Sequence, residues 1–356
     1  MRLTVLSVAY SFAPVGPDCI GGAEQILTDI DHALVAAGHS SLVLACESST
    51  AAGELIPFPP LHNDLDSPDQ RQWCRAQLQA LLDRTLSQRQ VDLIHMHGFD
   101  FHEYQLPLNI PVLVTLHLPL GWYPSTIWNR PPANLHFQFV SESQRLSCPD
   151  ALWDATVISN GVEISEAVER GDEFAMVLGR ICPDKNQHTA LEAGFVASTP
   201  VVMGGHVFPW REHERYFQEK VVPLLEQKRN GIQHTFCGRL PRAKRRQLLA
   251  QAKCLLHPTL APETSSLVAM EAMAAGTPVI AYPSGALPEI VDDGVTGFLV
   301  NSVTEMAAAI DRVHTIHPEA CRTTAAERFS KQRMVNQYLQ LYQEVIHAPT
   351  HQRLYA

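Results

Sequence analysis

Short apolar segments alternate with amphipathic segments along the first half of the chain. A strand is predicted at residues 3–8, then a helix at 23–37, which Gly38 ends, and then a strand at 41–45. Further strands are predicted at 93–96, 112–116, 137–140 and 156–159, with a helix at 71–86. Strands that are separated by helices pair in parallel, so this half is predicted to be a doubly wound sheet.

The same alternation restarts after Asn160-Gly161. Strands are predicted at 174–178, 201–203, 235–237, 254–256 and 279–281, and helices at 186–197, 212–227, 242–252 and 266–275. The polar stretch 161–173 is the linker candidate, and a last helix at 330–346 has no strand after it. The chain is therefore predicted to be an α/β protein with domains at 1–165 and 166–328 and a closing segment at 329–356.

Most polar motifs of the chain directly follow a predicted strand. Open parallel sheets bind ligands at the carboxyl ends of their strands, where the topology switches. Two such sheets that face each other enclose a cleft. We therefore expect the motifs described below to lie at a cleft between the two halves.

Two glutamates, Glu263 and Glu271, stand eight residues apart around the start of a predicted helix. Ser265 or Ser266 is the expected N-cap, and Gly276 ends the helix. The N–H groups of the first turn attract an anion such as a phosphate, and Glu271 leans back toward them. A carboxylate in that place accepts hydrogen bonds from hydroxyl groups such as a ribose diol, and Glu263 at the mouth suits a second hydroxylated group. Together they predict a nucleotide-sugar site.

Arg180 and Lys185 follow the strand predicted before them. Asp184 is the expected N-cap of the next helix, and Gln187 completes a capping box. Two cations at a helix N-terminus stabilise the charge that develops on a departing diphosphate. The alternative is that both residues pair with surface carboxylates.

In combination, these motifs resemble the retaining glycosyltransferases of sequence family 4, which have the GT-B fold. The resemblance covers most of residues 174–300. It rests on Gly179-Arg180, Lys185, the segment 263–280 and Gly285-Ala-Leu-Pro-Glu-Ile with Gly294-Val-Thr-Gly-Phe-Leu. The first half resembles the family less closely, through Gly21-Gly22-Ala23-Glu24, Val114-Thr-Leu-His117, Val140-Ser-Glu142 and Ser159-Asn-Gly-Val162.

The resemblance implies two Rossmann-like domains facing a cleft, with the last helix crossing back to the first domain. It implies a donor site in which Glu263 holds the transferred sugar, Glu271 the ribose, and Arg180 and Lys185 the diphosphate. Further expected contacts are Ser265, Ser266 and Leu267 at the phosphate or sugar, Arg239 near the base and His117 near the reacting centre. The implied mechanism retains configuration: the acceptor attacks from the side that the nucleotide leaves, and the departing phosphate oxygen takes its proton.

For the other candidate site residues in the first half, two interpretations are open. Gly21-Gly22, at the start of a helix, suits close approach of a ligand to the backbone, or makes a plain tight turn. His95 and His97 share one face of a strand without a convincing third metal ligand, so packing or, for His97, an acceptor pocket is expected. Trp122-Tyr123 stacks on a sugar ring or packs a loop.

Composition narrows the class of protein. The 356 residues, 46% hydrophobic and 18% charged, suit two soluble domains, and a net charge of −10 argues against nucleic acid as a partner. The basic run 239–246 is either a solvated helix start or, through Arg239, a contact to the donor.

Eight scattered cysteines without a Cys-x-x-Cys pair indicate reduced thiols. The segment 3–8 continues into Pro14 and a helix rather than a cleavage site, and no apolar run spans a bilayer. We expect a cytoplasmic protein with at most peripheral membrane contact.

The sequence lacks the residue patterns of several other enzyme classes. No Ser-His-Asp or Cys-His set emerges from the spacing, and the Gly-x-Gly-x-x-Gly fingerprint of nicotinamide enzymes is missing. Asp29-Ile-Asp31 falls inside a predicted helix and Asp64-Leu-Asp66 in a Pro-flanked loop, so neither is interpreted as a metal motif. We predict no metal requirement and no cofactor other than the nucleotide-sugar donor.

One departure from the family concerns the donor. Family members commonly have Glu-Gly-Phe-Gly where this chain has Glu263-Thr-Ser-Ser266. A UDP-sugar is favoured over a GDP-sugar, and the acceptor is a hydroxyl of a glycan, a lipid-linked sugar or a small molecule. The alternatives are a GT-B epimerase, which interconverts nucleotide sugars without an acceptor, and a non-catalytic nucleotide-sugar binding protein.

Overall fold

The structure, a computed structural model, describes residues 2–11, 13–58, 68–129, 131–149, 152–164, 171 and 173–348. The chain forms two compact units. The first unit comprises Met1–Ser159 together with Gln332–Ala356, and the second comprises Asn160–Lys331. Each unit is described by itself below.

The first unit contains a parallel sheet with the order β3-β2-β1-β4-β5-β6-β7. Its strands are β1 (Thr4–Val8), β2 (Ser40–Cys46), β3 (Glu54–Phe58), β4 (Leu93–Met96), β5 (Val112–Leu116), β6 (Leu135–Phe139) and β7 (Thr156–Val157). Six of them overlap the predicted strands. The missed strand, β3, lies at the sheet edge and contains Pro57, which lacks the N–H that an inner strand needs.

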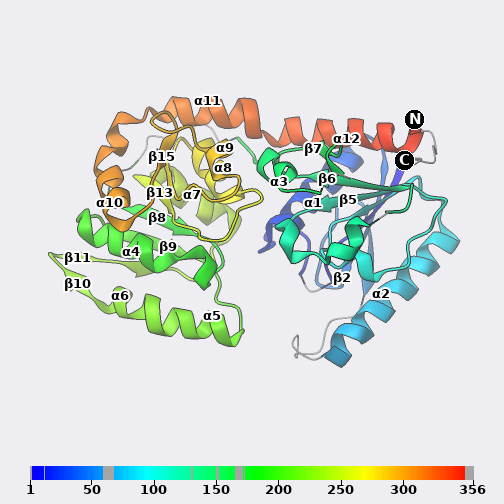
Figure 1. Ribbon diagram of the computed structural model, residues 1–356, viewed down its shortest axis with the longest axis horizontal. Coiled ribbons are helices and arrows are strands. Elements are labelled where there is room, and N and C mark those ends of the chain that lie inside the picture. Colours follow the sequence, from blue (N-terminus) through cyan, green and yellow to red (C-terminus); the bar gives the residue numbers. More distant parts are fainter. Residues whose placement is uncertain are drawn as a thin grey trace. The chain divides into compact units, whose positions relative to one another are not determined.

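Helices cover both faces of this sheet. They are α1 (Gly22–Ala36), α2 (Pro68–Gln88), α3 (Glu142–Leu146) and α12 (Lys331–His347). Leu78 and Leu82 of α2 pack in one core cluster with Leu6 and Leu44, while Leu27 of α1 packs in a different cluster with Val43, from the opposite face. Figure 1 shows α12, in red, running along the sheet of the first unit.

The last helix belongs to the first unit through buried hydroxyl groups. Tyr338 Oη donates to Gln138 Oε1 at 2.8 Å, and Tyr342 Oη lies 2.7 Å from His95 Nδ1. Both tyrosines are fully buried. The expectation that the C-terminal helix packs on the first half is therefore confirmed.

The second unit contains another parallel sheet, with the order β12-β9-β8-β13-β14-β15. Its strands are β8 (Ala175–Leu178), β9 (Val201–Gly204), β12 (Thr235–Phe236), β13 (Cys254–His257), β14 (Val279–Ala281) and β15 (Gly297–Leu299), and a small hairpin joins β10 (Lys228–Arg229) to β11 (Ile232–Gln233). The strand order runs outward from β8 in one direction and then from β13 in the other. The doubly wound fold predicted for both halves is confirmed.

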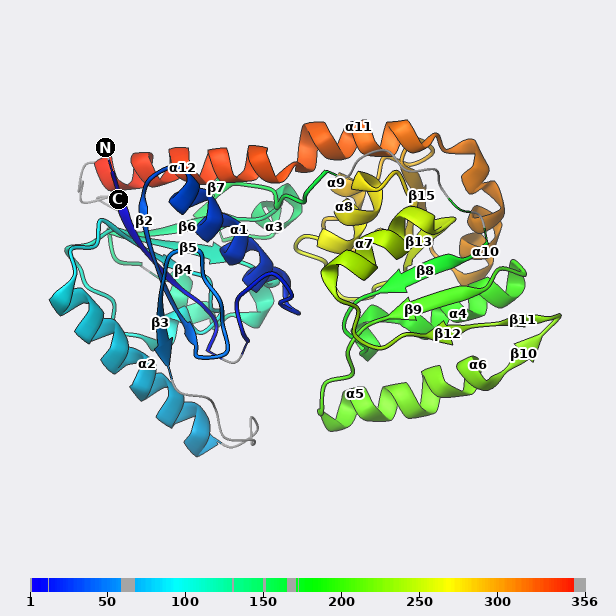
Figure 2. The same cartoon turned by 180° about the vertical axis from the view of Figure 1, so that it is seen from behind.

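Helices also flank the second sheet, as Figure 2 shows from behind. They are α4 (Gln187–Val196), α5 (Arg211–Tyr216), α6 (Val222–Glu226), α7 (Arg242–Gln251), α8 (Leu267–Ala274), α9 (Leu287–Ile290), α10 (Val303–Arg312) and α11 (Pro318–Phe329). Contacts join α4 to α10, and α8 to both α7 and α11. Among the described helices, none combines the length and apolar character needed to cross a lipid bilayer.

The predicted capping box at Asp184 is wrong. Residues Pro183–Lys185 form a 3₁₀ turn, and α4 begins two residues after Lys185, behind Asn186. Asn186 has φ 54°, a left-handed conformation that asparagine tolerates, and its Oδ1 accepts from Thr189 Oγ1 at 2.9 Å. Lys185 therefore lies in the tight turn between β8 and α4 rather than in the helix.

Candidate active site

The helix α8 begins at the centre of the second unit. Ser266 is its N-cap, with Oγ accepting from the Ala269 N–H at 3.4 Å, which resolves the choice between Ser265 and Ser266. Gly276 ends the helix at φ 84°. The preceding strand β13 neighbours β8 at the switch in strand order, so the loops after both strands meet where open sheets bind ligands.

Glu263 lies in the loop between β13 and α8 and forms an ion pair with Lys185. His257 Nε2 lies 3.2 Å from the same carboxylate oxygen, Glu263 Oε1. Burial raises the pKa of Glu263, but Lys185 and the hydrogen bond from His257 outweigh it and lower the pKa to about 2. Glu263 is therefore an ionised, largely buried hydrogen-bond acceptor.

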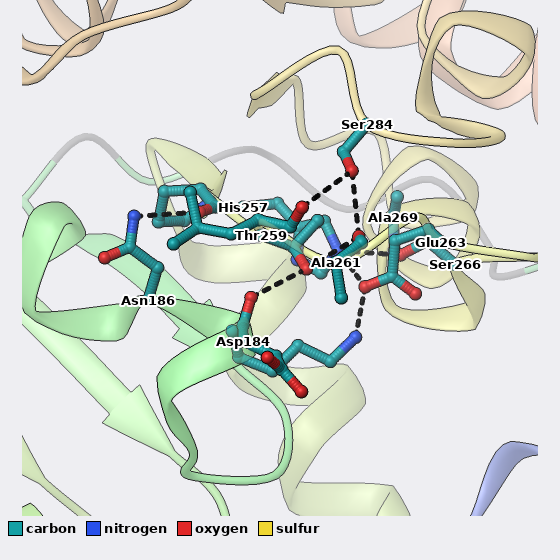
Figure 3. A network of polar contacts seen from close by, with 12 residues as sticks. Asp184, Asn186, His257, Thr259, Ala261, Glu263, Ser266, Ala269 and Ser284 are labelled. Carbon is teal, nitrogen blue, oxygen red and sulfur yellow. Dashed lines mark hydrogen bonds and ion pairs between the residues drawn. The ribbon is translucent and has the colours of Figure 1, made fainter. Parts of the chain in front are cut away.

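Hydrogen bonds to backbone carbonyls join the two loops that carry Lys185 and Glu263 (Figure 3). The Asp184 carbonyl accepts from the Leu260 N–H at 2.8 Å, and Asn186 Nδ2 donates to the Pro258 carbonyl at 3.1 Å. Gly285 has φ 58°, and a Cβ there would lie 2.2 Å from the Glu263 carbonyl oxygen. Only glycine fits this approach, so the glycine-rich motif downstream supports the backbone of Glu263.

Glu271 is buried within α8 and pairs with an arginine. Its Oε1 accepts from Arg245 Nη2 at 2.8 Å, and the two side chains are 8% and 18% exposed. Arg245 lies in the basic run 239–246, in which the sequence favours Arg239 as the donor contact. Arg239 itself is exposed, ahead of α7.

Arg180 lies in the loop after β8, half-buried, with its guanidinium 6.0 Å from the Trp210 ring centroid. Its carbonyl accepts from Gln187 Nε2 at 2.7 Å. Ser265 is half-buried and Leu267 is buried, next to Ser266 at the α8 start. Direct contacts thus join Lys185, Glu263 and His257 to Ser266, and α8 carries Glu271 from the same start.

The other predicted site residues belong to the first unit. Gly21 is the N-cap of α1 and Gly22 its first residue. A Cβ on Gly21 would lie 1.8 Å from Glu24 Oε2, so this glycine makes room for a buried glutamate. Burial raises the pKa of Glu24.

His117 follows β5 and forms part of a histidine cluster. Its Nε2 lies 3.1 Å from His97 Nδ1, and the two rings stack, whereas the His95 and His97 rings are tilted with centroids 3.9 Å apart. Burial lowers the pKa of His117 to about 3, so the ring is neutral at pH 7. Nearby, Tyr123 is buried against Phe101, whereas Trp122 is 49% exposed.

The first aspartate motif, Asp29-Ile-Asp31, lies in a helix. Asp31 lies within α1, and its carboxylate accepts the Ala52 N–H at 2.6 Å and the Gly53 N–H at 3.1 Å, a structural role. The motif Asp64-Leu-Asp66 lies outside the described residues. Within the described ranges, no group of three or more His, Cys, Asp or Glu side chains is arranged to hold a metal ion.

Two residues that contact the candidate site were missed by the sequence interpretation, His257 and Arg245. His257 ends β13, directly before Pro258, and its position at the carboxyl end of a strand is the signal that identifies it. Arg245 stands three positions after the first residue of α7, on the face toward α8. A single arginine in a basic run carries no such signal without the partner helix.

Two family models match consecutive segments of the chain. The family described as "Glycosyltransferase Family 4" matches residues 20–166, and "Glycosyl transferases group 1" matches residues 163–328. The second match contains Arg180, Lys185, Glu263 and Glu271. Together the two matches run from residue 20 to residue 328, and so include most of both units but neither β1 nor α12.

Individual relatives match at different lengths. An uncharacterized 41.2 kDa protein from the cps region of Klebsiella pneumoniae is 45% identical over 87 residues, which are 22% of this chain and 24% of that protein. The chain is 38% identical over 282 residues to the MMP alpha-(1->4)-mannosyltransferase of Mycolicibacterium hassiacum, covering 67% of this chain and 66% of the relative. The match thus spans about a quarter of the first relative and about two thirds of the other.

A solved structure shares the whole fold. HepE of Anabaena, in complex with UDP-glucose, has a TM-score of 0.73 and 21% identity, covering 96% of this chain and 100% of HepE. The likeness extends across both units.

Proposed function

Since the chain belongs to the glycosyltransferases of family 4 and group 1, with the GT-B fold, we propose that it transfers a sugar from a nucleoside diphosphate sugar to a hydroxyl acceptor with retention of configuration. A UDP-sugar is favoured, because HepE binds UDP-glucose; a GDP-sugar is the alternative. The acceptor is a hydroxyl of a glycan, a lipid-linked sugar or a small molecule.

The observation that carries the proposal is the Lys185–Glu263 pair beside the start of α8, at the switch in strand order. The Lys185 ammonium has three N–H donors, so it retains Glu263 and still donates to a diphosphate. Glu263 is ionised, and a carboxylate that is already paired accepts from neutral sugar hydroxyls rather than competing for the phosphate. This arrangement suits a neutral sugar next to an anionic leaving group.

In the proposed mechanism, Lys185 and Arg180 stabilise the charge that develops on the departing diphosphate, aided by N–H groups at Ser266 and Leu267. Glu263 orients the transferred sugar and Glu271 the ribose. The acceptor hydroxyl attacks on the side that the diphosphate leaves and gives its proton to the departing phosphate oxygen.

The remaining proposed contacts complete the substrate site. Ser265 contacts the phosphate or sugar, and Arg239 lies toward the base. The neutral His117 ring donates or accepts a hydrogen bond near the reacting carbon without adding charge there. Gly21 and Gly22 present backbone N–H groups to the donor. The reaction requires no metal, because protein cations take the role of the ion.

A thermal-shift panel tests the site. UDP, GDP, ADP and their sugars are added without metal to the wild-type chain, Lys185→Ala and Glu271→Ala. Stabilisation of the wild type by one nucleotide sugar, lost in both variants, supports the site; equal stabilisation of the variants rejects it. Lys244→Ala is the control, because Lys244 is exposed and its side chain donates to Gln247 Oε1 at 3.1 Å, within the same helix.

Product analysis separates the transferase from its alternatives. The transferase consumes the bound donor with a hydroxyl acceptor and keeps the anomeric configuration. An epimerase interconverts nucleotide sugars in the absence of acceptor, and a binding protein shows no turnover with any acceptor of the panel. Either of these results contradicts the proposed reaction.

A further inference from the structure

We propose that His257 is a positioning residue for the donor, which acts through Glu263 and Ser266; this inference rests on the proposed function. His257 is the last residue of β13 and only 4% exposed. Its Nε2 lies 3.2 Å from Glu263 Oε1 and also 3.2 Å from Ser266 Oγ (Figure 3). One buried nitrogen thus links the loop carboxylate to the N-cap of α8.

The partners of His257 determine which of its ring nitrogens carries the proton. Glu263, paired with Lys185, is an ionised carboxylate and only accepts hydrogen bonds. The contact to Glu263 Oε1 therefore requires a hydrogen on His257 Nε2. Because this nitrogen is a donor, Ser266 Oγ accepts from it as well, as the second arm of a shared hydrogen bond.

The same reasoning fixes the Ser266 hydroxyl. Its oxygen already accepts from the Ala269 N–H at 3.4 Å, so the bond from His257 engages its second lone pair. The hydroxyl hydrogen then points to neither partner. Within the described residues no acceptor for that hydrogen is found, so it remains available to an anionic oxygen of a ligand.

One carboxylate oxygen of Glu263 is likewise engaged by protein groups, and the other is available to a ligand. Both Lys185 and His257 engage Oε1, and the described residues offer no hydrogen bond to Oε2. A lysine ammonium on its flexible stem does not fix the rotation of a carboxylate, but the rigid His257 ring, anchored in β13, does. Oε2 therefore faces the ligand as a preset acceptor for sugar hydroxyls, and Ser266 as a preset donor.

Variants of His257 test this arrangement. His257→Gln keeps an N–H donor, whereas His257→Phe removes it. UDP-glucose and UDP, or GDP-mannose and GDP if the wild type prefers them, are titrated against each variant. We expect the preference for the nucleotide sugar over the bare nucleotide to fall about tenfold in His257→Phe and to be largely restored in His257→Gln, because the lost bond is charge-assisted and orients the sugar-binding carboxylate.

A second buried histidine provides the control. His234 is 3% exposed, and its Nδ1 accepts from the Val201 N–H at 3.0 Å, at the amino end of β9 and away from the carboxyl ends. His234→Phe should lower stability without changing the preference for the nucleotide sugar. A general packing defect would change both histidine variants alike.

The outcomes separate this inference from the proposed function. If the wild type binds no nucleotide sugar, the proposed function fails. If it binds one and His257→Phe retains the full preference, or His257→Gln loses as much as His257→Phe, the positioning role is overturned. Nitrogen NMR of the labelled wild-type chain gives a readout without activity: His257 should carry its proton on Nε2, and a neutral ring protonated on Nδ1 contradicts the proposal even if a variant does not fold.

Discussion

The ion pair between Arg245 and Glu271 gives the proposed ribose site a fixed orientation. Arg245 Nη2 engages Glu271 Oε1 at 2.8 Å, and the carboxylate is only 8% exposed. In Arg245→Ala we expect the preference for UDP over 2′-deoxy-UDP to fall about tenfold, because a carboxylate without its arginine is held less firmly and discriminates less between a diol and a single hydroxyl. Stability should fall by about 3 kcal/mol, as a buried charge loses an ion-pair partner.

Arg246→Ala is the matched control for Arg245, and calorimetric titration is the measurement. Arg246 is the next residue of α7 and pairs with Glu163 at 3.0 Å, with its side chain 35% exposed. Its removal should change neither the ribose preference nor stability by more than about 0.5 kcal/mol. An unchanged preference in Arg245→Ala would remove Arg245 from the site.

The low pKa of Glu263 makes stability depend on pH. Folding lowers this pKa from the ordinary 4.5 to about 2. A carboxyl with a lowered folded pKa stabilises the protein above its unfolded pKa, and this contribution, about 3 kcal/mol, is lost as pH falls from about 4.5 toward 2. Urea unfolding at pH 7 and at pH 3 should therefore show a smaller acid-induced loss in Glu263→Gln than in the wild type.

A surface glutamate controls this experiment. Glu319, 61% exposed in its pair with Arg322, should behave like the wild type when changed to Gln. Equal pH dependence in the wild type and Glu263→Gln would mean that Glu263 is not held as an ionised partner of Lys185.

At the scale of elements, the α8 N-terminus combines a cap with the proposed anion site. Ser266→Ala should cost about 1 kcal/mol, because the Ala269 N–H loses its acceptor. Ser266→Asp restores the cap but places a negative charge where the diphosphate is proposed to bind. We expect it to weaken nucleotide-sugar binding at least tenfold, measured by titration, and to lose some stability in urea unfolding, because the new carboxylate is buried near Glu263.

Ser302, the N-cap of α10, separates the two effects. Its Oγ accepts from the Glu305 N–H at 3.1 Å on an exposed helix start. Ser302→Asp should keep both stability and donor binding. Full donor binding by Ser266→Asp would place the anion elsewhere.

The elements predicted well are those whose pattern is local. The strands β4, β5 and β14 begin and end where their apolar runs do, and Ser266 caps α8 as a serine before an apolar helix should. The elements missed depend on context. One such element is β3, which contains a proline that only an edge strand tolerates. The helices α10 and α11 were missed although Ser302 caps α10 locally.

Site residues show the same division. Glu263, Lys185 and Ser266 are recognisable from their spacing around strand ends. His257 carries the same signal, a place at the end of a strand, but was missed. Arg245 carries none, because its partner lies 26 residues away on another helix. The turn at Asp184 failed as a helix cap because Asn186, in the left-handed conformation, delays the start of α4.

At the scale of the whole molecule, the chain order and the folding units differ. The second unit is one continuous segment, Asn160–Lys331, but the first needs residues from both ends of the chain. Tyr338 and Tyr342 of α12 supply hydrogen bonds to Gln138 and His95, which are otherwise buried polar groups of the first sheet. Removing α12 would leave them without those partners and would expose an apolar face.

Fragments should therefore differ in stability. We expect residues 160–331 to unfold cooperatively alone, because their sheet and helices contact one another, whereas residues 1–159 should be unstable until a peptide of residues 331–348 is added. Circular dichroism with urea titration measures both. A peptide with Tyr338→Phe and Tyr342→Phe should restore less stability to residues 1–159. The loss should be about 1–2 kcal/mol for each missing hydroxyl, because each substitution leaves a buried polar group without its hydrogen bond. A peptide with Gln340→Ala should restore the full stability, because Gln340 bonds only to Glu344 on the same exposed face of the helix among the described residues. Cooperative unfolding of residues 1–159 without any peptide would show that α12 is not needed by the first sheet, and the C-terminal helix would then be an accessory rather than a part of the first unit.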